Sequence, residues 1–64
     1  MAELIQAIDD GWEPTELREE REGSTSFDVV VAEKDGQSRE FKSDHLAFHR
    51  YVEGLMEDYG LSYS

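Results

Sequence analysis

The sequence predicts a small α+β fold in the order α-β-β-β-α, with a three-stranded antiparallel sheet that carries both helices on one face. Three observations predict it: apolar residues recur at helical spacing near both ends, β-branched residues alternate in the middle, and an Asp-Gly dipeptide follows them directly. The chain has 64 residues and no cysteine. We therefore expect one domain spanning residues 1–64, without disulfides.

The first helix is expected over residues 2–9. Leu4, Ile5 and Ile8 share one helical face there, and Gly11 offers a stop. The two aspartates just before this glycine lie where the helix macrodipole disfavours negative charge. A local rule broken in this way tends to mark function, or an environment that screens the charge.

Residues 12–22 fit either a helix or a strand. They contain strong helix formers, but Leu17 is the only aliphatic side chain among them, so a helix would bury almost nothing. As a strand, the segment would lie at an edge of the sheet, with Pro14 near its start and charges that block sheet-to-sheet association. We favour the strand.

The second strand is expected over residues 25–33, where β-branched residues dominate and Phe27, Val29 and Val31 alternate onto one face. Residues 37–42 return as the third strand after the Asp-Gly turn. We interpret the face that carries Phe27, Val29 and Val31 as the face that packs on the helices.

The length of the loop between these strands decides their register. A two-residue loop pairs Val30 with Phe41, whereas a three-residue loop over Lys34–Gly36, with a left-handed glycine, pairs Val29 with Phe41. The three-residue loop places the aromatic residues and most of the valines on one face. We therefore favour the three-residue loop.

The last helix is expected to begin after a cap at Ser43 or Asp44 and to end at Gly60. Gly54 lies in its middle, at a cost of roughly 1 kcal/mol, and we expect it to permit a close approach of another segment. The apolar spacing predicts a core stripe of Phe48, Val52, Leu55 and Tyr59, flanked by Tyr51 and Met56.

The composition excludes several classes of function. A formal net charge of −10 argues against direct binding to nucleic acid or to an anionic membrane, because Lys and Arg make such contacts. It favours rapid, salt-sensitive association with basic surfaces. The chain has no apolar run of about 20 residues and no secretory signal, so we expect a cytoplasmic protein, of the host cell if phage-encoded.

Signals of catalysis or metal binding are weak. His45, His49 and Glu53 follow one another at intervals of four residues, a spacing that zinc accepts, but two histidines bordering an apolar stripe more often cover it. There is no nucleophile elbow and no phosphate-binding glycine loop. We predict no enzyme activity, no cofactor and no metal.

The acids are concentrated, because seven of the sixteen lie within residues 9–22. Alternate side chains on one face of a strand stand about 6.6 Å apart. That spacing is comparable with the phosphates of a nucleic-acid strand, which rises about 3.4 Å per nucleotide. Carboxylates along the strands are therefore predicted to form a phosphate-like track: Glu16, Glu20, Glu22, Asp28, Glu33, Asp35 and Glu40.

The order of these features resembles a known family. The "LIQAI" helix, Trp12 before the first strand, "VVVAEKDG", a short third strand and the helical spacing of "LAFHRYVEGL" are similar to the small acidic anti-CRISPR proteins of phages. Members of that family mimic DNA, and the resemblance is to those that inhibit type II-A Cas9. Small acidic inhibitors of type I effectors are also known. The resemblance implies contacts from Asp35 with Gly36, and from Glu40, to the partner's basic residues.

The leading hypothesis is therefore a DNA-mimicking inhibitor that occupies the basic DNA-binding site of a CRISPR effector and blocks target DNA binding. The alternatives are a small domain of a salt-loving organism and an antitoxin-like binder of a basic protein. The predicted partner-binding residues are Asp9, Asp10, Glu13, Glu16, Glu19, Glu20, Glu22, Asp28, Glu33, Asp35, Gly36 and Glu40.

Overall fold

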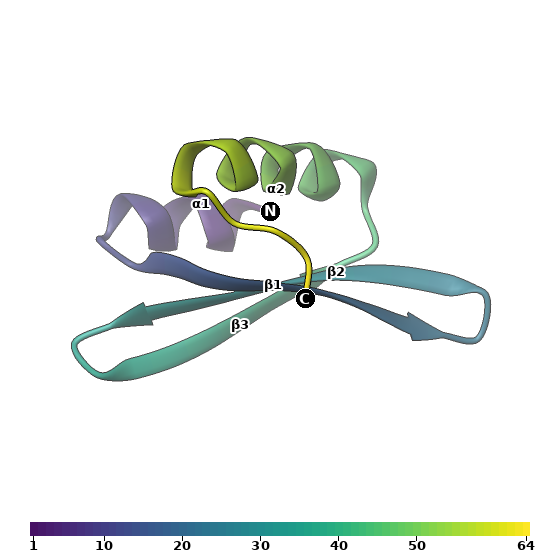
Figure 1. Cartoon of the computed structure of the whole chain (residues 1–64), viewed down its shortest axis with the longest axis horizontal. Helices are drawn as coiled ribbons and strands as arrows, with labels where there is room; N and C mark the ends of the chain where they lie inside the picture. The colour runs from purple at the N-terminus through teal and green to yellow at the C-terminus, as the bar shows by residue number, and fades with distance from the viewer.

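A computed structural model describes residues 1–64 and has two layers, a twisted three-stranded sheet and two helices that cover one face of it (Figure 1). The predicted α+β fold is confirmed, and so is the strand over the ambiguous first acidic segment. Neither helix is long and apolar enough to cross a membrane. The elements in chain order are α1 (Ala2–Asp9), β1 (Glu13–Glu22), β2 (Thr25–Lys34), β3 (Gln37–Ser43) and α2 (Leu46–Tyr59).

The hairpin between β2 and β3 has a two-residue turn, so the favoured three-residue loop is wrong. Lys34 pairs with Gln37, and Val30 pairs with Phe41. The turn residues take positive φ values, 53° at Asp35 and 78° at Gly36. Such a turn matches the right-handed twist of the strands, and aspartate and glycine tolerate the left-handed conformation better than most residues.

The shorter turn changes which face of the sheet packs on the helices. Val30 and Ala32 of β2 are buried in the core, while Phe27, Val29 and Val31 point to the opposite face. The expectation that these three residues face the helices is therefore wrong, because a slip of one residue exchanges the two faces of a strand.

Val29 is nevertheless only 1% exposed on this outer face. Its cross-strand neighbours are Arg18 on β1 and Lys42 on β3. The Nζ atom of Lys42 lies 4.6 Å from the centre of the Phe27 ring. Long basic side chains can thus cover apolar residues with their aliphatic stems while their charges stay in water.

The core lies between the sheet and the two helices. Of the predicted stripe on α2, Phe48, Val52 and Leu55 are buried, but Tyr59 is 43% exposed and lies outside the core. Trp12, Ile8 and Tyr51 pack at its margin. The core residues are Leu4, Ala7, Leu17, Val30, Ala32, Phe41, Phe48, Val52 and Leu55.

The chain ends by returning to the sheet. α2 begins at Leu46 with His45 at its N-cap position, so the predicted cap at Ser43 or Asp44 is wrong. The helix ends at Tyr59 and is followed, as predicted, by Gly60, which takes the left-handed conformation. The last residues then cross to the free edge of β1, where Tyr63 forms a parallel bridge with Leu17 (Figure 1). The amide of Ser64 donates to the carbonyl oxygen of Leu17 at 3.1 Å. This segment ties α2 to β1.

Candidate functional site

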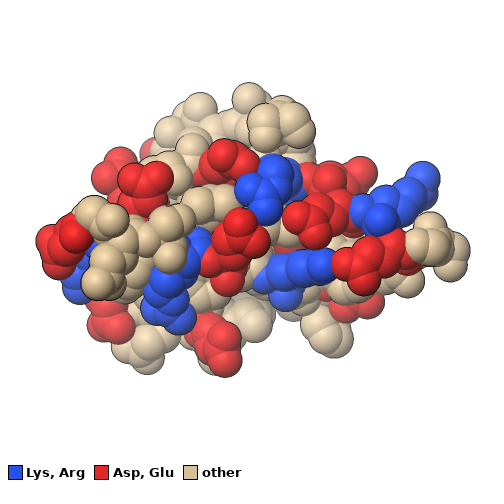
Figure 2. All heavy atoms as spheres, turned by 90° about the horizontal axis from the view of Figure 1, so that it is seen from below, with Lys and Arg blue, Asp and Glu red and all other residues tan.

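The outer face of the sheet, turned away from the helices, carries acidic and basic side chains together (Figure 2). Leu17 and Val30 point toward the helices, so strand alternation places their neighbours on the outer face. The acids on this face are Glu13, Glu16, Glu20 and Glu22 of β1, Glu33 of β2 and Glu40 of β3.

Two cations form ion pairs with four of these six acids. The Arg18 guanidinium lies 2.7 Å from Glu16, 3.4 Å from Glu20 and 3.1 Å from Glu40. The Lys42 ammonium lies 3.3 Å from Glu20 and also pairs with Glu22. We call these six residues the Arg18–Lys42 network.

The network keeps its groups charged. Hydrogen bonds from Lys42 and Arg18 lower the pKa of the Glu20 carboxyl, and a hydrogen bond to Glu22 raises the pKa of Lys42. All of these groups are in contact with solvent, so each pair adds little stability and weakens with salt. The predicted phosphate-like track is therefore interrupted by two cations from the chain itself.

A second group of acids has no such cations. We call Asp9, Asp10, Glu13, Glu33 and Asp35 the acidic end, because the C-terminus of α1, the start of β1 and the β2–β3 turn meet there. None of these carboxylates forms an ion pair. Glu13 and Glu33 lie directly opposite each other across β1 and β2, an arrangement of like charges that destabilises a sheet.

One lysine holds the acidic end together without neutralising its carboxylates. The Nζ atom of Lys34 donates to the backbone carbonyl oxygen of Asp10 at 2.6 Å. This contact places a positive charge at the C-terminus of α1, where the macrodipole favours a cation. It also ties the end of α1 to the hairpin, and it leaves the acidic end with one lysine among five carboxylates, none of which is in an ion pair.

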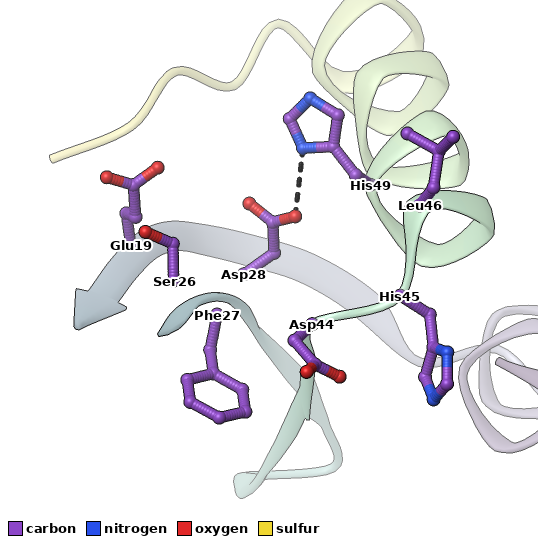
Figure 3. Close-up of a pocket in the computed structure, with 8 residues that line it drawn as sticks. All are labelled: Glu19, Ser26, Phe27, Asp28, Asp44, His45, Leu46 and His49. Carbon is purple, nitrogen blue, oxygen red and sulfur yellow. Dashed lines mark hydrogen bonds and ion pairs between the residues drawn. The ribbon is translucent and has the colours of Figure 1, made fainter. Parts of the chain in front are cut away.

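Asp28 belongs to neither group. It lies on the helix-facing side of β2 and is 8% exposed, so it is not part of the outer acidic face. Its carboxylate is 2.9 Å from His49 Nδ1, and the Tyr63 hydroxyl donates to it at 2.7 Å (Figure 3). Asp28 therefore joins β2, α2 and the C-terminal segment, and its predicted role in the track does not fit this position.

A pocket of about 310 Å³ opens beside this contact. In Figure 3, Glu19 and Asp28 stand on the same side of the sheet, whereas the His45 ring points away from His49. The protein has no group of three or more His, Asp or Glu side chains placed to hold a metal ion. The lining residues are Glu19, Ser26, Phe27, Asp28, Asp44, His45, Leu46 and His49.

We predict that His49 titrates above its ordinary pKa of 6.5, because its hydrogen bond and charge interaction with Asp28 favour the protonated ring. Because the folded-state pKa is raised, the contact between protonated His49 and Asp28 stabilises the fold fully below about pH 6.5. This stabilisation is lost as the pH rises through the raised pKa. An NMR titration of the His49 ring will measure the shift.

The matched variants are Asp28→Asn and Glu57→Gln, since both remove one carboxylate. Asp28→Asn should lower the His49 pKa toward 6.5, and Glu57→Gln should leave it nearly unchanged. An equal change in both variants would show that the general field of the protein, and not the contact with Asp28, sets the titration.

The residues that organise these groups were not among the predicted site residues. Arg18 and Lys42 carry the outer network, and His49 and Tyr63 bind Asp28. Strand alternation places Arg18, Val29 and Lys42 on one face as soon as the two-residue turn is chosen. No family model, curated protein or solved structure matches this chain significantly.

Proposed function

We propose that this protein is a DNA-mimicking inhibitor, which occupies the basic DNA-binding site of a CRISPR effector and blocks the binding of target DNA. The observation that carries the proposal is the acidic end, where five carboxylates lie on adjoining elements and none forms an ion pair. Lysine and arginine side chains of a DNA-binding surface supply the missing cations and relieve the repulsion between Glu13 and Glu33.

The position of the acidic end agrees with the resemblance to the anti-CRISPR family. That resemblance implies partner contacts from Asp35 and Gly36, which form the turn within the acidic end. Glu40 is a weaker candidate because Arg18 already pairs with it. The Arg18–Lys42 network therefore lies beside the main contact surface, and the resemblance, together with the net charge of −10, supports a partner whose natural ligand is DNA.

The test is a competition for DNA at about 0.15 M salt, in which exposed charges still act over about 8 Å. The protein is titrated into a type II-A Cas9 and into a type I complex, each with labelled target DNA. Loss of DNA binding at near-stoichiometric inhibitor is the expected result for the true target. DNA that stays bound in both complexes would contradict the assignment to these CRISPR effectors.

We predict that the double variant Asp35→Asn with Glu33→Gln weakens binding to the effector about tenfold or more. Asparagine tolerates the left-handed backbone of Asp35, so the turn is kept. The control, Glu53→Gln with Glu57→Gln, removes the same number of charges from the exposed side of α2 and should change the affinity little. Equal losses in the two variants would mean that total charge acts, without a focused contact surface.

One observation favours a second candidate, a small domain adapted to high salt. Exposed acids also lie on the helix layer, at Glu3, Glu53, Glu57 and Asp58, and a salt-adapted surface carries acids on every face. Circular dichroism against salt concentration separates the two candidates. Folding only in molar salt would indicate the salt-adapted domain, whereas a chain that is already folded at about 0.15 M salt agrees with the proposed inhibitor.

A further inference from the structure

Gly54 lies in the third turn of α2, where a glycine weakens the helix. A Cβ atom added to it would meet no atom within 4 Å outside its chain neighbours and the surrounding helix backbone. The close approach expected there within the chain is therefore absent, and the missing side chain leaves open space on the protein surface. The chain's own packing gives no reason for a glycine at this position.

The open space belongs to a groove of about 240 Å³ between α1 and α2. Tyr59, at one end, is 43% exposed although its ring is largely apolar. Pockets for small-molecule ligands have volumes of about 300–1,000 Å³. The groove is smaller and open, and its size suits an inserted side chain of another protein. It is lined by Ile8, Tyr51, Gly54, Leu55 and Tyr59, with Arg50 and Asp58 among them.

The charge around the groove decides what can occupy it. Asp58 lines the groove. Burial raises the pKa of the Tyr51 phenol, and the negative charge of Asp9 raises it further, so Asp9 also acts on this side of the groove. Arg50 is the single cation of the lining. A second copy of the chain would bring another net charge of −10, so it is repelled. A basic occupant is attracted.

We propose that the groove between α1 and α2 is a docking site for a basic amphipathic helix of a partner protein. An apolar side chain of that helix inserts over Gly54, where the absence of a Cβ lets the two backbones come close. Its lysine or arginine side chains reach Asp9 and Asp58. The site lies on the helix layer and shares only Asp9 with the acidic end, so it goes beyond the proposed function.

The probe is a synthetic amphipathic helix built from leucine and lysine, and two control peptides carry glutamate in place of lysine or a scrambled order. NMR of the labelled protein at about 0.15 M salt follows the backbone amides. The expected result is a set of shifts at Ile8, Gly54 and Leu55 with the basic peptide only. Shifts restricted to the acidic end, or no shifts at all, would overturn the proposal.

The decisive variant is Gly54→Leu, which fills the groove. Leucine is a better helix former and has free space there, so the melting temperature should rise while the peptide binds about tenfold more weakly or not at all. Ala47→Leu adds the same kind of side chain at an exposed site outside the groove and should leave binding unchanged. Undiminished binding to the Gly54→Leu variant, or a lower melting temperature, contradicts the proposal.

The outcome for the groove is separate from the outcome for the acidic end. The variant Asp35→Asn with Glu33→Gln leaves the lining of the groove intact, and we expect it to keep the peptide shifts at Gly54. Loss of those shifts in this variant would show that the peptide is held by the acidic end, and the groove would then have no role of its own.

Discussion

Replacing Leu17 by alanine is expected to produce the largest loss of stability of any single truncation in β1, about 2–5 kcal/mol at 25 °C. Leu17 is fully buried, lies opposite Val30, and is the only aliphatic side chain of β1. Truncation of a buried leucine costs about 2–5 kcal/mol. A chain of 64 residues has a free energy of unfolding of roughly 3–10 kcal/mol. The substitution therefore removes a large part of the total stability.

Urea denaturation followed by circular dichroism measures the loss. The matched control is Leu46→Ala, the same substitution at a side chain that is 63% exposed, where we expect a change within about 0.5 kcal/mol. Comparable losses at the two positions would mean that β1 does not pack on the helices through Leu17, and the two-layer arrangement would have to be revised.

Replacing Tyr63 by phenylalanine is expected to lower the free energy of unfolding by about 1.5–3 kcal/mol at pH 7. The Tyr63 hydroxyl donates to the nearly buried carboxylate of Asp28, and phenylalanine leaves that carboxylate with His49 as its single side-chain partner. In a domain of this size each kcal/mol lowers the melting temperature by about 4–8 °C. We therefore expect a fall of about 6–24 °C.

Tyr59→Phe is the control for this prediction, because the Tyr59 side chain is largely exposed and its hydroxyl makes no hydrogen bond within the protein. Differential scanning calorimetry should show little change in this variant. The Tyr63→Phe protein should also show faster amide exchange at Ser64, whose amide is bonded to Leu17. Unchanged melting in both variants would mean that the C-terminal segment does not hold the fold together.

The arrangement of helices and strands was predictable because its signals are local. Apolar spacing over a few residues identified α1 and α2, and the Asp-Gly turn separated β2 from β3. The scarcity of apolar side chains in residues 12–22 correctly favoured a strand, since a single buried leucine is enough for an edge strand but not for a helix. The order of the elements follows from these patterns.

The register of the hairpin was not predictable in this way. Both loop lengths are compatible with the Asp-Gly dipeptide, and the choice rested on the assumption that valines and aromatic residues face the core. The assumption failed at Val29 and Phe27, because Arg18 and Lys42 cover apolar surface on the outer face. A slip of one residue then placed Asp28 under α2, away from the acidic surface.

The amino-acid sequence by itself was enough for the net charge, the strand and helix order and the acidic character of residues 9–22, because each depends on composition or on neighbours a few positions apart. The three-dimensional arrangement was needed to separate the ion-paired acids of the Arg18–Lys42 network from the acids of the acidic end, which form no ion pair. The pairings between different strands join residues at least twenty positions apart, as between Arg18 and Glu40, and they depend on a register that no local pattern specifies.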